Sequence, residues 1–161
     1  MIRLEHLNLV VRDISETLAF YQAAFPHWKV RGGEAATWYG VARNWVHFGD
    51  DYNYLTFNDQ GQGENRDLTS NTLGLSHFAF VTSDIESLIE RLKLAGFPPD
   101  KIGAENKYRK NVYYIDPNGY EIEFVEYLTD IPSQRNQYDN QQQTNTFRGN
   151  EREYRNPSWY F

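Results

Sequence analysis

The chain has 161 residues, a net charge of −6, a pI of about 5.2 and no cysteine. A chain of this length can bury the core of one domain without disulfides, and thiolate metal sites are excluded. No segment reaches the roughly 18 consecutive apolar residues of a membrane span, and no Lys/Arg stripe indicates nucleic-acid binding. The N-terminal segment lacks a signal-peptide cleavage pattern, so we expect a soluble, cytoplasmic protein.

The first half of the chain is predicted to form a strand, a helix and further short strands. Residues 3–11 are rich in aliphatic side chains and predict a strand. Asp13 and Glu16 form a possible capping box at the start of a helix over 14–25. The short strands that follow are expected at 28–32, 36–42, 44–48 and 52–57, and polar residues 58–73 form a linker.

The second half repeats this order. A strand over 74–82 is followed by a possible capping box of Ser83 and Glu86, and by a helix over 85–95 whose apolar residues recur every three or four positions. Residues 97–107 favour no single element. Two strands, 108–115 and 120–127, are joined by Asp-Pro-Asn-Gly, whose residues are typical of turns.

An internal duplication connects the two halves. Leu4, His6, Val10, Asp13, Ile14 and Ala24 recur as Leu75, His77, Val81, Asp84, Ile85 and Ala95, at a constant offset of 71 residues. A gapless match of this length indicates two copies of one structural unit.

The chain therefore divides into a repeated part and an extension. Residues 1–128 are expected to form one domain of two modules, 1–58 and 74–128. Residues 129–161 form a polar C-terminal extension rich in Gln, Asn and Arg. This extension ends in three aromatic residues, Trp159, Tyr160 and Phe161, which we expect to dock on this subunit or on a partner.

The duplication places two histidines at equivalent positions of two strands. A single His on a strand is usually a hydrogen-bonded core residue, but the repetition of His6 as His77 calls for a further explanation. Glu121 and Glu123 share one face of the last strand of the second copy. Two imidazoles and a carboxylate with open positions suit Fe(II), Mn(II), Ni(II) or Zn(II). His27 and His47, by contrast, are interpreted as partly exposed or structural.

These features resemble the vicinal oxygen chelate superfamily, which includes glyoxalases, bleomycin resistance proteins and extradiol dioxygenases. The resemblance covers about residues 2–127, through the strand with His, the Asp-capped helix and the ending Asp116-Pro-Asn-Gly119-Tyr-Glu-Ile-Glu123. It implies an α+β fold in which two βαβββ modules pair into a cup-shaped mixed sheet with helices outside. It also implies one divalent metal ion held by His6, His77 and Glu123.

Two positions of the chain depart from the pattern of glyoxalase I, and both bear on which reaction the protein could catalyse. Tyr54 stands where glyoxalase I has a carboxylate ligand, and Val10 stands where that enzyme has an arginine. The match of Val112-Tyr113 through Glu123 resembles the extradiol dioxygenases, in which the tyrosine orients the substrate. The catalytic His of those enzymes is missing, since Ala104, Glu105 and Asn106 occupy its place.

Three hypotheses remain. The first is a metal-dependent enzyme acting on a small oxygen-chelating substrate, with Tyr113 and Tyr54 as hydrogen-bonding groups near that substrate. The second is a ligand-sequestering protein of the bleomycin-resistance type, without catalysis. The third is a structural or interaction protein in which both histidines are core residues. The resemblance also implies a homodimer.

Overall fold

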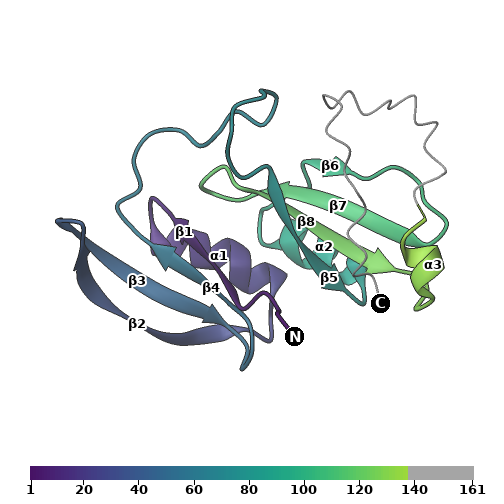
Figure 1. Ribbon diagram of the computed structural model, residues 1–161, viewed down its shortest axis with the longest axis horizontal. Helices are drawn as coiled ribbons and strands as arrows, with labels where there is room; N and C mark the ends of the chain where they lie inside the picture. The colour runs from purple at the N-terminus through teal and green to yellow at the C-terminus, as the bar shows by residue number, and fades with distance from the viewer. Residues whose placement is uncertain (138–161) are drawn as a thin grey trace.

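The computed structural model describes residues 1–137, which form two modules of the order strand, helix, three strands (Figure 1). The first module contains β1 (His6–Val10), α1 (Ile14–Ala24), β2 (Lys29–Trp38), β3 (Val41–Gly49) and β4 (Tyr54–Asn58). The second contains β5 (His77–Thr82), α2 (Ile85–Leu94), β6 (Lys101–Ile102), β7 (Arg109–Ile115) and β8 (Glu121–Tyr127). A short helix, α3 (Pro132–Arg135), follows. The predicted repeat of βαβββ modules is confirmed.

Each module builds its own four-stranded sheet. The strand orders are β1-β4-β3-β2 and β5-β8-β7-β6, so the first and last strands of each module are neighbours in the sheet. These two strands pair in parallel in both modules, whereas the other pairs are antiparallel. The predicted α+β class with mixed sheets is therefore confirmed, and the two sheets have the same topology because the sequence is duplicated.

Both long helices begin at an aspartate. The Asp13 carboxylate accepts the Glu16 amide at 2.8 Å, as a predicted helix cap should. In the second module the cap is Asp84, whose carboxylate accepts the Ser87 amide at 2.9 Å. The prediction that Ser83 and Glu86 cap α2 is wrong by one residue, since the acceptor is the equivalent of Asp13 in the repeat.

The predicted strands of the first module differ from the observed ones in one place. Residues 28–32 and 36–42 were expected to form two strands, but β2 runs through the intervening glycines and ends at Trp38. A Cβ on Gly33 would lie 2.4 Å from the Trp45 carbonyl oxygen, so glycine permits the close pairing of β2 with β3. The turn falls instead at Tyr39 and Gly40, which have positive φ values of 51° and 79°.

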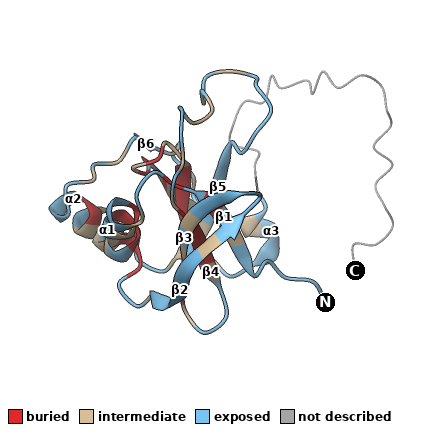
Figure 2. Cartoon of the chain, turned by 90° about the vertical axis from the view of Figure 1, so that its left-hand side faces the viewer, coloured by how far each residue is buried: buried red, intermediate tan, exposed pale blue. Residues whose placement is uncertain are grey.

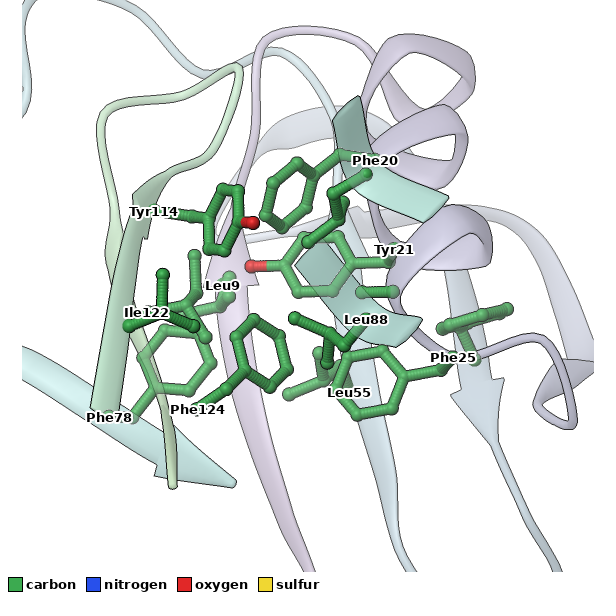
Figure 3. Packing of buried hydrophobic residues seen from close by; sticks show 14 of the residues in the cluster. Leu9, Phe20, Tyr21, Phe25, Leu55, Phe78, Leu88, Tyr114, Ile122 and Phe124 are labelled. Carbon is green, nitrogen blue, oxygen red and sulfur yellow. The ribbon is translucent and has the colours of Figure 1, made fainter. Parts of the chain in front are cut away.

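The hydrophobic core lies where the two helices meet the strands (Figure 2). Alternation along β1 directs Leu7 and Leu9 toward this core and His6 toward the opposite face. From α1, the rings of Phe20 and Tyr21 are fully buried and pack toward strands of both modules (Figure 3). One continuous core therefore joins the modules, and it uses the face of each sheet that carries no histidine.

Polar contacts join the modules as well. The side chain of Asn118, in the β7–β8 turn, accepts the Arg12 amide at 2.8 Å and donates to the Thr17 hydroxyl at 2.9 Å. The buried Tyr21 hydroxyl donates to Asp116 at 3.2 Å. The linker is tied to the same turn, because the Asn65 side chain donates to the Asn118 carbonyl. The β7–β8 turn therefore fixes one module on the other.

The remaining expectations concern the C-terminal extension and the membrane. Residues 129–137 include α3, whereas the aromatic end 159–161 lies outside the described residues. The boundary of the domain at residue 128 stays a prediction. Within residues 1–137, every helix is too short or too polar to cross a membrane.

Candidate functional site

His77 and Glu123 come together on the second sheet. The parallel register of β5 and β8 places His77 opposite Glu121 and Ala79 opposite Glu123, so all four side chains share one face. The His77 Nε2 lies 3.3 Å from a carboxylate oxygen of Glu123. The His77 Nδ1 lies 3.7 Å from a carboxylate oxygen of Glu121. His77 therefore stands between two carboxylates.

The separation of His77 Nε2 and Glu123 Oε2 fits a metal ion. Two ligands with bonds of about 2.1 Å at a tetrahedral or octahedral centre lie roughly 3.0–3.4 Å apart. The observed 3.3 Å falls in this range. A nitrogen and a carboxylate oxygen are also the donors that Fe(II), Mn(II), Ni(II) and Zn(II) accept. The donor pair therefore fits the predicted ion without rearrangement of either backbone.

Neighbouring side chains orient the Glu123 carboxylate. Its Oε1 accepts one hydrogen bond from the Asn111 amide and another from the Tyr113 hydroxyl, the latter at 3.0 Å. Desolvation and the charge of Glu123 raise the pKa of Tyr113 to about 12. Tyr113 is therefore protonated and a hydrogen-bond donor at neutral pH, and it binds Oε1 together with Asn111 while Oε2 faces His77.

An open cleft of about 390 Å³ runs along this face of the second sheet. Its lining includes Ala79, Asn111, Tyr113, Glu123 and Val125. The cleft therefore combines a few apolar side chains with a buried carboxylate, a phenol and further polar groups.

The predicted residues His6 and Tyr54 lie on the first sheet. They are opposite each other in the parallel pair of β1 and β4, and their rings stack at 4.7 Å with an interplanar angle of 11°. The His6 side chain is 39% exposed, and its Nδ1 lies 3.0 Å from Glu5. The phenol of Tyr54 therefore covers one side of the His6 ring.

His47 extends this stack. Its ring centroid lies 4.5 Å from that of Tyr54 and 4.6 Å from that of Trp45, and the Arg31 guanidinium lies 4.7 Å from the Tyr54 centroid. Desolvation, followed by the charges of Arg31 and His6, lowers the pKa of His47. The sequence interpretation of His47 as partly exposed or structural agrees with its intermediate burial, and its place in this stack is an addition that the structure makes. Alternation along β3 was the available signal, since Trp45 and His47 share a face.

The structure thus brings together His77, Glu123 and Tyr113 on one sheet, and His6 and Tyr54 on the other. Among residues 1–137, no three His, Cys, Asp or Glu side chains are grouped so that they could hold one metal ion. Both histidines lie on the faces turned away from the common core, and their side chains are about equally exposed, at 39% and 40%. The predicted triad is therefore divided between two outward faces of one chain.

Comparison with solved structures agrees with this fold. A glyoxylase/bleomycin resistance protein/dioxygenase domain from Frankia sp. EAN1pec superposes with a TM-score of 0.65 at 20% identity, covering 81% of this chain and 96% of that one. Fosfomycin resistance protein FosX from Listeria monocytogenes, as a variant complexed with Mn(II) and 1S,2S-dihydroxypropylphosphonic acid, gives 0.63 at 19% identity, covering 84% and 98%.

A glyoxalase family protein from Bacillus cereus gives a TM-score of 0.65 at 14% identity, covering 80% of this chain and 96% of that one. No curated protein matches the sequence. The model of one family matches residues 3–124, which is most of the chain. The chain belongs to the Glyoxalase/Bleomycin resistance protein/Dioxygenase superfamily.

Proposed function

We propose that this chain is a divalent-metal-dependent enzyme of the glyoxalase or dioxygenase type, acting on a small oxygen-chelating substrate. The observation that carries the proposal is the 3.3 Å approach of His77 Nε2 and Glu123 Oε2, with the second oxygen of Glu123 held by Asn111 and Tyr113. His6 is the third proposed ligand. The Mn(II) complex of FosX supports a divalent ion in a protein of this fold.

The roles of the residues follow from their chemistry. A bound divalent ion supplies Lewis acidity to two oxygens of the substrate. The neutral phenol of Tyr113 donates a hydrogen bond and, with its raised pKa, does not act as a base at neutral pH. Tyr54 and His47 lie beside His6, where they can contact the substrate. Ala79 and Val125 supply apolar side chains to the cleft lining.

We also propose that a homodimer completes the site. The core occupies the inner faces of both sheets, so His6 and His77 of one chain point away from the shared helices. A second copy can lay the His6 face of its first sheet against the His77 face of the second sheet. A cytoplasmic location stays a prediction from the cysteine-free composition.

The first test is the metal content of the untagged protein, measured by elemental analysis. We expect about one equivalent of iron, manganese, nickel or zinc per chain, and its loss in His77→Ala and Glu123→Gln. Circular dichroism of the variants confirms that they are folded. A wild-type protein that binds no divalent ion, even after reconstitution, contradicts the metal-enzyme proposal.

A mixing experiment tests whether the site is shared between chains. His6→Ala and His77→Ala homodimers should each bind no metal. In a mixed dimer, one site carries both substitutions and the other carries neither, so metal binding should return when subunits are exchanged. If the mixture stays metal-free while mixed dimers are detected by mass spectrometry, both ligands come from one chain.

A second candidate function is the sequestration of an aromatic ligand. It is favoured by the stack of His6, Tyr54, His47 and Trp45 on the first sheet, which presents aromatic rings without any need for a metal. Metal-free protein that quenches its Trp fluorescence on binding planar aromatic compounds would support this function. Loss of that quenching in Trp45→Leu would place the ligand on this face.

A further inference from the structure

Glu121 is a buried carboxylate beside the proposed metal centre. It is 6% exposed and lies on β8 directly opposite His77. Its Oε1 accepts the ammonium of Lys101, and its Oε2 faces His77 Nδ1 at 3.7 Å. A buried carboxylate is costly unless its charge is compensated, and the Lys101 ammonium provides that compensation.

Each ring nitrogen of His77 faces a different carboxylate. Nε2 faces Glu123, the proposed ligand, and Nδ1 faces Glu121. A histidine that binds a metal through one ring nitrogen commonly donates its other N–H to a carboxylate or carbonyl. The 3.7 Å separation needs to shorten by roughly half an ångström or more to reach hydrogen-bond length, which a small rotation of either side chain permits.

We propose that Glu121 is a positioning residue for His77. It accepts a hydrogen bond from Nδ1–H, fixes the tautomer of the imidazole and directs Nε2 toward the ion shared with Glu123. This inference rests on the proposed function, because it assigns a role toward the same metal centre. It goes beyond that function by giving the two glutamates on this face of β8 different roles. Glu123 is a metal ligand, and Glu121 positions the ligand His77.

The positive charge of Lys101 allows the Glu121 carboxylate to be buried and still take this role. Its ammonium binds Glu121 and also lies 4.8 Å from the centroid of the Tyr113 ring, which is opposite Lys101 in the β6–β7 pair. Lys101 therefore neutralises Glu121 while the second oxygen remains turned toward His77. The alternative role of Glu121 is a structural ion pair with Lys101 that is indifferent to His77.

The two roles differ in their effect on metal binding. We would titrate wild type, Glu121→Gln, Lys101→Met and His77→Ala with Co²⁺ and follow the d–d absorption of the ion, with thermal unfolding as the measure of structure. Glu121→Gln should bind Co²⁺ about 10-fold to 100-fold more weakly, with an altered spectrum. Lys101→Met breaks the same ion pair but keeps the carboxylate, so its affinity should fall less than that of Glu121→Gln.

Each outcome decides one of the two proposals. Co²⁺ binding that His77→Ala abolishes and Glu121→Gln leaves at wild-type affinity and spectrum overturns the positioning role alone. Equal losses of affinity in Glu121→Gln and Lys101→Met also overturn it, since the ion pair then explains both. Wild-type protein that binds no Co²⁺ overturns the proposed function itself. Should Glu121→Gln fail to fold, the double variant Glu121→Met/Lys101→Met replaces it and is compared with Lys101→Met alone, because apolar replacement of both members of a buried ion pair is often tolerated.

Discussion

Tyr113 shows how one buried neighbour sets the chemistry of a side chain. Its hydroxyl donates to Glu123, and desolvation together with that negative charge raises the pKa of the phenol to about 12. The pKa in the folded state therefore lies above the unfolded value of about 10. Its contribution to stability is present below pH 10 and is lost as the pH rises toward 12.

Replacement of Tyr113 by Phe should therefore leave the shape of the pH–rate profile unchanged between pH 6 and 9. The phenol is protonated throughout this window, so its removal lowers the rate by removing a hydrogen bond and not by removing a titration. Turnover of any accepted substrate, measured across this range for both proteins, checks the expectation. If the wild-type pH–rate profile has a limb near pH 9 that disappears in Tyr113→Phe, the phenol ionises at a much lower pH than its raised pKa implies.

At the scale of single elements, the two helix caps explain where the modules change from strand to helix. Asp13 and Asp84 occupy equivalent positions of the duplication, and each accepts the amide three residues later. Asp84 also accepts the Ser87 hydroxyl at 2.6 Å. These bonds, first from the hydroxyl and then from the amide, lower the pKa of Asp84. A lowered pKa stabilises the fold above the unfolded value of about 3.8, and this contribution is lost as the pH falls through the folded value.

Asp84→Asn should therefore make stability less sensitive to acid below about pH 4. Asparagine still caps the helix but carries no titrating carboxylate, so the pH-dependent part of the free energy is removed. Urea unfolding at a series of pH values between 2.5 and 6 measures the effect. Ser87→Ala, which deletes only the hydroxyl donor, should give an intermediate slope. Identical slopes in wild type and Asp84→Asn would contradict this account of the cap.

At the scale of the whole molecule, the β7–β8 turn holds the two modules together. Asn118 is 6% exposed and reaches across to the Arg12 amide and the Thr17 hydroxyl of the first module. Beside it, Phe20 of α1 packs against Tyr114, and Phe25, which follows α1, packs against Phe124 of the second sheet. Since both polar and apolar contacts cross the boundary, neither module has a complete core of its own.

Asn118→Ala is expected to destabilise the protein by about 2–4 kcal/mol, because it leaves the Arg12 amide and Thr17 hydroxyl without this partner. Thr17→Val, which keeps the shape but removes the bond from Asn118 and the one that the Thr17 hydroxyl donates to the Asp13 carbonyl, should cost about 1–2 kcal/mol. Urea unfolding followed by fluorescence and by circular dichroism should give one coincident transition for each protein. Two separate transitions would show that the modules unfold independently.

The sequence by itself determined the local features of this protein. The 71-residue duplication predicts two equivalent βαβββ modules, and strand periodicity places Glu121 and Glu123 on one face because successive side chains alternate. The parallel pairing of the first and last strands then brings His77 and Glu123 together, as the family resemblance implies. Such features depend on neighbours in sequence or on the shared topology of the repeat.

Only the tertiary structure decided which faces meet. The core forms between the helices and the faces opposite to the histidines, so His6 and His77 of one chain point outward on separate sheets. Likewise, Lys101 reaches Glu121, and His47 stacks on Tyr54, through strand registers that no local pattern specifies. The physical reason is that helix packing and sheet register are set by many weak side-chain contacts between residues far apart in sequence, whereas periodicity reports only which side of one element is apolar.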